Sequence, residues 1–176
     1  LAGIHCCGTP DWGAVLRLPV DVVGFDAVRR LRDFLDVGAP LEDFVARGGV
    51  IGGSSAGATI QGEFLVRGNP LGNTDEWCEG YDRGFGFLPG CAVDQHFLAR
   101  NRTKDLQGLI EQLPQLIWLG IDEGTAAIVR GSELEVLGDS KIAVFDRRKS
   151  GVEAQAPFPT WLSPGARWDL VAGKVR

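Results

Sequence analysis

The sequence contains no methionine, few histidines and no long run of apolar residues. Its 176 residues include 2 His and 4 Cys and carry a formal net charge of −5. No apolar run approaches the roughly 20 residues that a membrane-spanning helix needs, and no segment has the layout of a signal peptide. An acidic balance without a basic stripe argues against nucleic acid or an anionic membrane surface as a partner.

The cysteines show no disulfide framework. Cys6 and Cys7 are adjacent, which is a poor geometry for pairing with each other, and Cys78 and Cys91 have no framework spacing. Reduced thiols are therefore expected, and with them a cytoplasmic location. The start at Leu1 and the lack of Met lead us to expect that the sequence begins inside, or after processing of, a longer translated chain.

The length and the apolar content of 44% suit a single α/β domain over residues 1–176. The first half alternates strand and helix patterns, and short strands joined as hairpins by turns at Gly131-Ser132 and Gly138-Asp139 follow. This order predicts a mainly parallel sheet with helices on both faces and antiparallel strands added at one edge. Helices are expected at 25–35, 40–47, 56–66 and 103–112, and strands at 20–23, 91–97, 116–121, 126–130, 134–137, 141–145 and, as a pair, within 161–171.

Residues 48–58 (GGVIGGSSAGA) predict a short buried strand, a turn of small residues and the start of a helix. Within them, Gly53-x-Ser55-x-Gly57 matches the nucleophile-elbow pattern, in which a sharp turn needs small neighbours. The backbone N–H of Ala56 would then lie at a helix N-terminus, where it can stabilise an oxyanion. A phosphate-binding loop is the other interpretation, but Ala58 stands where its Lys should be.

A serine nucleophile needs a base and a group that orients the base. His96, at the end of a predicted strand, is better placed than His5 in the unassigned N-terminal segment. The acid is expected within residues 120–125 (GIDEGT), again at a strand end, and polar groups at several strand ends can meet along one edge of an α/β sheet. The chain order Ser, His, acid differs from the Ser, acid, His order of α/β-hydrolases.

Two other chemistries compete with the serine site. Asp94 and His96 alternate onto one face of a predicted strand, and Asp122 and Glu123 could approach them to hold a metal ion, although no Cys/His spacing completes a site. A cysteine nucleophile is disfavoured because Cys91 and His96, five residues apart on one strand, point to opposite faces.

Several blocks together resemble the cyanophycinase family of serine peptidases, which includes aspartyl dipeptidase (alpha-aspartyl peptidase). They are residues 53–58 (GSSAGA), 81–90 (YDRGFGFLPG), 93–97 (VDQHF), 120–126 (GIDEGTA) and 161–165 (WLSPG). The resemblance runs from about residue 45 to the end. It implies a three-layer sandwich like that of class I glutamine amidotransferases, with a mainly parallel central sheet and added antiparallel strands, here shortened at the N-terminus.

The resemblance also implies roles for individual residues. Ser55 would be the nucleophile of an acyl-enzyme, His96 the general base and Glu123 the orienting acid, with Gly53, Ala56 and Gly57 forming the elbow and oxyanion site. The expected substrate-binding residues are Asp94, Gln95, Arg100 and Arg102. The substrate would be a peptide or small aspartyl compound, such as a cyanophycin-like β-Asp-Arg or an Asp-X dipeptide, and no cofactor is needed.

Three departures from the family pattern bear on these expectations. Asp105 stands where a further arginine is expected, and residues 21–27 (DVVGFDA) lack the family's Gly-Gly-x-Gln element. The chain is also short before this region, which would leave a sheet edge that a second copy of the chain, in a homodimer, could cover. The alternative function is therefore a catalytically impaired homologue with a binding or structural role.

Overall fold

The computed structural model describes residues 3–6, 11–17, 19, 22–25, 39–72, 74–148 and 158–176. Contacts divide the chain into two compact units, Leu1–Gly57 and Ala58–Arg176. The helix predicted over 25–35 lies outside the described residues, except for Phe25 itself, which ends a strand. The single domain over 1–176 stays a prediction.

The described part of the first unit contains a parallel pair of strands and the short helices α1 and α3. Strand β1 (Gly3–Cys6) pairs with β2 (Val22–Phe25). Helix α1 (Trp12–Leu16) begins where the Asp11 side chain accepts the Ala14 N–H at 3.0 Å. Helix α3 (Ala39–Ala46) ends before Gly48, whose φ of 92° suits only glycine. The predicted helix from Pro40 to the glycine stop is thus confirmed.

The segment that follows α3 differs from the prediction on both sides of Ser55. Residues 48–53, all described, form no strand beyond an isolated bridge residue, Val50, which is 52% exposed. Helix α4 (Ala56–Thr59) does begin directly after Ser55, as predicted. It does not run to residue 66, because β3 (Gly62–Phe64) leaves the helix to pair with a later strand. Gly62 fits this pairing, since a Cβ there would lie 2.9 Å from the Cys91 carbonyl oxygen.

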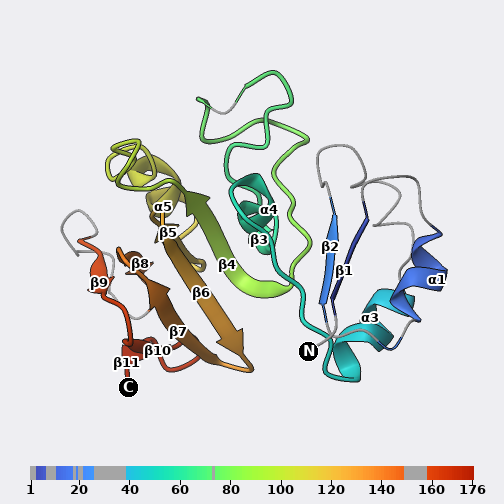
Figure 1. The fold of residues 1–176 in the computed structure, drawn as a ribbon. Helices are drawn as coiled ribbons and strands as arrows, with labels where there is room; N and C mark the ends of the chain where they lie inside the picture. Colours follow the sequence, from blue (N-terminus) through green and yellow to red (C-terminus); the bar gives the residue numbers. More distant parts are fainter. Residues whose placement is uncertain are drawn as a thin grey trace. The chain divides into compact units, whose positions relative to one another are not determined.

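The second unit is built on a five-stranded sheet in the order β3-β4-β5-β8-β9 (Figure 1). The members after β3 are β4 (Leu88–Gln95), β5 (Ile117–Ile121), β8 (Ile142–Asp146) and β9 (Thr160–Leu162). Strands β3, β4 and β5 are parallel, whereas β8 and β9 are antiparallel additions. A parallel set extended by antiparallel strands confirms the predicted mixed α/β class.

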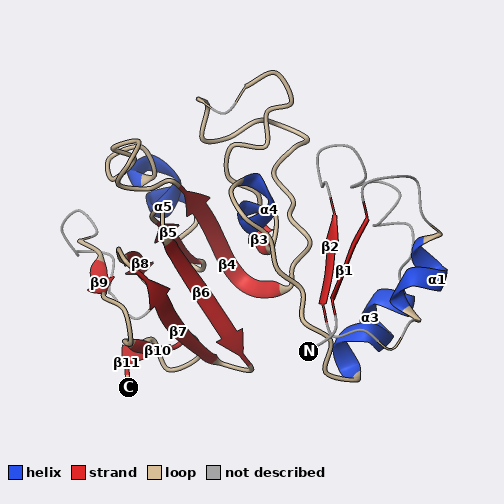
Figure 2. Ribbon diagram, in the orientation of Figure 1, coloured by secondary structure: helices blue, strands red, loops and turns tan. Residues whose placement is uncertain are grey.

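A second, antiparallel sheet has the order β11-β10-β7-β6 (Figure 2). Its strands are β6 (Thr125–Arg130), β7 (Glu133–Gly138), β10 (Arg167–Asp169) and β11 (Lys174–Val175). Gly131, with a φ of 58°, turns β6 into β7, so the predicted hairpin is confirmed. Strand β8 does not continue this hairpin series, because it pairs with β5 in the other sheet.

Alternation along the central strands creates two cores in the second unit. Inward residues of β4, β5 and β8 on one face pack with Leu134, Val136 and Trp168 of the antiparallel sheet. The residues between them pack on the opposite face with Ile110 of α5 (Gln107–Gln112). Both faces of these strands are therefore buried, which fixes their register and the positions where they end. No helix in the described part of the chain is long and apolar enough to cross a membrane.

Candidate active site

The carboxyl ends of β4 and β5 bring the predicted base and acid together. The two strands are parallel neighbours, with Asp94 opposite Gly120 and Gln95 opposite Ile121. Both strands end at the Gln95–Ile121 pair, so His96 and the acidic pair at 122–123 leave the sheet at the same edge. The strand predicted to run to residue 97 stops at Gln95, because His96 has a φ of 52°, outside the strand region.

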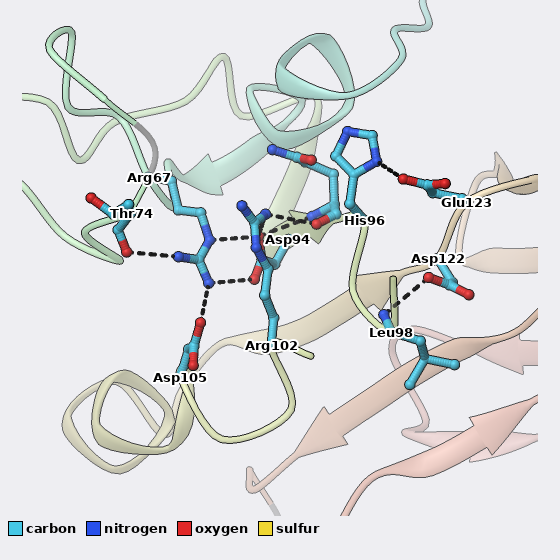
Figure 3. Close-up of polar contacts among 10 residues, drawn as sticks. Arg67, Thr74, Asp94, His96, Leu98, Arg102, Asp105, Asp122 and Glu123 are labelled. Atoms are coloured by element: carbon cyan, nitrogen blue, oxygen red, sulfur yellow. Dashed lines mark hydrogen bonds and ion pairs between the residues drawn. The ribbon is translucent and has the colours of Figure 1, made fainter. Parts of the chain in front are cut away.

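The His96 ring meets Glu123 directly. Nδ1 of His96 lies 2.8 Å from Oε1 of Glu123 (Figure 3). A carboxylate only accepts, so in the neutral imidazole Nδ1 carries the hydrogen and Nε2 is the acceptor atom. The imidazole side chain is 22% exposed and the carboxylate 59% exposed, which leaves the ring accessible to solvent and to a reactant. This is the arrangement by which a carboxylate orients a general base.

Asp122, the other acid of the pair, faces the backbone instead of the imidazole. Its Oδ1 accepts the N–H groups of Leu98 and Ala99, both at 3.0 Å, and its Oδ2 accepts the Ser140 hydroxyl at 2.7 Å. Burial raises the pKa of Asp122, but these hydrogen bonds outweigh burial and leave that pKa below its ordinary value. The acidic segment expected from the sequence therefore holds two carboxylates with different partners.

Asp94 lies inside a buried ion cluster at the end of β4. Its carboxylate has no exposed surface, and the Arg67 and Arg102 side chains are 3% and 4% exposed. Arg67 donates from Nε to Oδ1 at 3.1 Å and from Nη2 to Oδ2 at 3.2 Å, and Arg102 donates from Nη1 to Oδ1 at 3.0 Å (Figure 3). Both oxygens of Asp94 are thus engaged by guanidinium groups, an arrangement in which the carboxylate and the two cations compensate the burial of opposite charges.

Arg67 is a site residue that the sequence analysis missed. Besides binding Asp94, its guanidinium donates to the Thr74 carbonyl at 3.0 Å and to the Asp105 carboxylate at 3.0 Å. The backbone N–H of Arg67 donates to the Glu76 carbonyl. Burial lowers its pKa, yet Asp94 and Asp105 outweigh burial and raise that pKa above its ordinary value. Arg67 therefore ties the long segment between β3 and β4 to the end of β4. In the sequence, Arg67 is a single charged residue after Leu65 and Val66, and this pattern does not predict a buried ion cluster.

The other predicted substrate-binding residues lie around this cluster. Gln95 is 7% exposed, and within the described residues its Oε1 has no hydrogen-bond partner. Arg100 is exposed, whereas Arg102 is buried and its Nη1 also reaches the Gln95 carbonyl at 2.7 Å. Burial lowers the pKa of Arg102, the charge of Asp94 opposes this, and the net pKa is below the ordinary value. Their contact with a substrate stays a prediction.

Ser55 belongs to the first unit and has the backbone geometry of a strained turn. Its φ is 53°, a left-handed value that is uncommon for a residue with a side chain, and the residue is exposed. A Cβ on Gly53 would lie 2.2 Å from the Gly57 carbonyl oxygen, so the turn accepts only glycine at 53. Helix α4 begins at Ala56. Ser55 thus lies in a tight turn directly before a helix, as predicted, but without the predicted strand before it; its role as the nucleophile and its convergence with His96 stay predictions.

The competing chemistries find less support in the same region. Among residues with a described position, no group of three or more His, Cys, Asp or Glu side chains could hold a metal ion. Cys91 is buried on β4, and burial raises the pKa of its thiol to about 11. A thiol with that pKa is protonated near neutral pH and is a poor nucleophile.

Comparisons with known proteins identify the family of this chain. The sequence profile described as peptidase family S51 matches residues 34–137. A cyanophycinase from Geminocystis herdmanii is 34% identical over 98 residues, which cover 54% of this chain and 36% of that protein. A cyanophycinase from Trichormus variabilis is 36% identical over 104 residues, which cover 57% of this chain and 35% of that protein. The match thus spans little more than a third of each curated relative.

A solved structure has the same fold. The crystal structure of a peptidase from an acI-B1 Actinobacterium aligns with a TM-score of 0.61 over 91% of this chain and 63% of that chain. The aligned residues are 21% identical, so this likeness concerns the fold alone. The matched profile includes the turn at Ser55 and both strand ends that carry His96 and Glu123.

Proposed function

Because the chain belongs to peptidase family S51, we propose that it is a serine-type peptidase whose triad is Ser55, His96 and Glu123. The observation that carries the proposal is the 2.8 Å contact between His96 Nδ1 and Glu123 Oε1 at adjacent strand ends. It leaves Nε2 as the acceptor that a serine nucleophile requires. The strained turn at Ser55 supplies a second, independent support, since a nucleophile elbow holds its serine in such a conformation.

The proposed reaction begins when Ser55 Oγ attacks the carbonyl carbon of the scissile amide. His96 Nε2 takes the hydroxyl proton as the C–O bond forms, and Glu123 stabilises the resulting imidazolium through Nδ1. Negative charge then develops on the carbonyl oxygen. The Ala56 N–H, at the start of α4, is the donor that we assign to this oxyanion.

Collapse of the tetrahedral intermediate breaks the C–N bond. His96 returns its proton to the leaving amine, and the acyl group stays on Ser55 as an ester. A water molecule then attacks this ester while His96 takes the water proton. The second intermediate releases the carboxylic acid and restores the Ser55 hydroxyl, so the cycle consumes one water and no cofactor.

The substrate that we propose has an aspartyl unit beside the scissile bond, as in β-Asp-Arg or Asp-X dipeptides. Arg100 is exposed directly after the His96 turn, and its charge is near enough to lower the pKa of Arg102. Cationic side chains at this edge favour a substrate carboxylate. The matched relatives are named cyanophycinases, which is consistent with an aspartyl substrate.

A panel of α-Asp-X, β-Asp-Arg and neutral dipeptides tests this proposal. We expect cleavage of the aspartyl members, and Arg100→Ala should raise their KM more than it lowers kcat. Ser55→Ala should abolish turnover, and His96→Ala and Glu123→Ala should each cause a large loss with little change in folding. Cleavage of neutral dipeptides alone would contradict the aspartyl assignment. Absence of cleavage across the panel by the folded protein would favour the catalytically impaired homologue.

A further inference from the structure

The turn that carries His96 is shaped by the residues that follow β5. Phe97 is fully buried, and a Cβ on Gly120 would lie 2.6 Å from its ring, so the ring packs on the bare backbone of Gly120. The Phe97 N–H then donates to the Ile121 carbonyl at 3.2 Å. The end of β5, at Gly120 and Ile121, thus packs against and hydrogen-bonds the first residue after His96.

Asp122 continues this series by accepting the next two N–H groups of the turn. Leu98 donates to Oδ1 at 3.0 Å (Figure 3). Ala99 also donates to Oδ1 at 3.0 Å, and Ser140 donates to Oδ2 at 2.7 Å and holds the carboxylate in place. Charge-assisted hydrogen bonds of this kind are stronger than neutral ones. The lowered pKa of Asp122 agrees with a carboxylate that stays ionised in this setting.

We propose that Asp122 is a positioning residue, which holds the 96–99 turn so that the His96 imidazole meets Glu123. The inference rests on the proposed function, in which His96 is the general base. A residue with a side chain is disfavoured at a φ of 52°, so contacts of the turn around His96 have to compensate for this conformation. The two adjacent carboxylates therefore have different roles. Glu123 orients the imidazole ring, and Asp122 holds the backbone of the turn that carries the ring.

Proton exchange at His96 Nδ1 measures this positioning without relying on catalysis. The chain contains two histidines, so His5→Gln leaves His96 as its single imidazole for ¹H–¹⁵N spectra. In this background Asp122→Ala should speed exchange of the Nδ1 proton about tenfold or more, because the ring leaves Glu123. Asp122→Asn should stay near the parent, since an amide oxygen accepts the same two N–H groups.

Turnover of the cleaved dipeptide supplies the second readout. Asp122→Ala should lower kcat about 10- to 100-fold and leave KM within about twofold, because a misplaced base slows chemistry and not binding. Asp139→Ala is the matched control: it removes an exposed carboxylate from the neighbouring turn, and among the described contacts none joins that side chain to residues 96–99. It should match the parent in both readouts.

The outcomes separate this inference from the proposed function. An Asp122→Ala protein with the parent exchange rate would overturn the positioning role, whatever its turnover. If the parent protein hydrolyses no dipeptide, the proposed peptidase function is refuted. The exchange rates still test whether Asp122 positions His96. If Asp122→Ala does not fold, Ser140→Ala loses only the hydroxyl that holds Oδ2. That variant should exchange about twofold or more faster than the parent, and an unchanged rate would overturn the proposal.

Discussion

Replacing Asp94 with alanine should destabilise the second unit strongly. The change removes a carboxylate with no exposed surface and leaves Arg67 and Arg102, 3% and 4% exposed, without their shared counter-charge. Arg67 keeps its contacts to Thr74 and Asp105, and Arg102 keeps the Gln95 carbonyl. These remaining contacts satisfy part of the hydrogen bonding, but two positive charges then lie buried side by side.

Loss of one partner from a buried ion pair typically costs about 3–5 kcal/mol. Whole domains are stable by only about 5–15 kcal/mol, so Asp94→Ala should remove a large part of the free energy of unfolding. For a protein of this size, the same loss lowers Tm by about 6–20 °C. Urea unfolding followed by tryptophan fluorescence measures it, since Trp118 is fully buried in the same unit.

Asp105→Ala is the matched control for this prediction. Asp105 also binds the Arg67 guanidinium at 3.0 Å, but its side chain is 37% exposed. An ion pair that water can reach contributes about 1 kcal/mol or less, so this variant should unfold close to the wild-type midpoint. If Asp94→Ala lowers the free energy of unfolding no more than Asp105→Ala does, the buried cluster does not stabilise the end of β4.

Three further predictions concern other parts of the chain. Gly53→Ala should slow fluorophosphonate labelling of the folded protein by more than about tenfold, because its Cβ would lie 2.2 Å from the Gly57 carbonyl oxygen, whereas Gly52→Ala, with open space around its Cβ, should label normally. Cys91 should resist iodoacetamide at pH 8 until the protein unfolds, because burial raises its pKa to about 11, and peptide mapping would disprove this if Cys91 were alkylated in the native state. Hydrogen bonds from the Ala172 backbone and from Arg176 lower the pKa of Asp169 to about 2. The ionised Asp169 therefore stabilises the fold fully above its unfolded pKa, about 3.8, and this contribution is lost as pH falls through 2. Urea midpoints that fall equally in wild type and Asp169→Asn between pH 5 and 2 would refute this prediction.

Local pattern was enough to predict the two strands that carry the site, although β4 ends at Gln95 and not at residue 97. His96 and the acidic pair follow apolar runs that form β4 and β5, and parallel pairing then places both ends at one edge. The hairpin of β6 and β7 was also readable, since β7 alternates between buried and less buried residues and Gly131 marks the turn. In strands with one buried face, the alternation of apolar and polar residues predicts which face is buried.

The partners of β8 and Arg67 could not be read in this way. Residues 142–145 of β8 are buried on both faces, so they give no alternation, and only the tertiary fold decides that β5 is the neighbour of β8. An arginine is exposed by default, and Arg67 is buried only because Asp94, 27 residues away, supplies its counter-charge. The helix expected over 56–66 failed for the same reason, because pairing with β4 overrides local propensity after Thr59.

Covalent labelling with a fluorophosphonate, followed by peptide mapping, tests the proposed triad most directly. The reagent reacts with a serine hydroxyl only when a base activates it. We predict one adduct on Ser55 of the folded wild-type chain, strongly slowed labelling in His96→Ala and Glu123→Gln, and none in Ser55→Ala. An unlabelled Ser55 in the folded wild type, or labelling that does not depend on His96, would contradict the account.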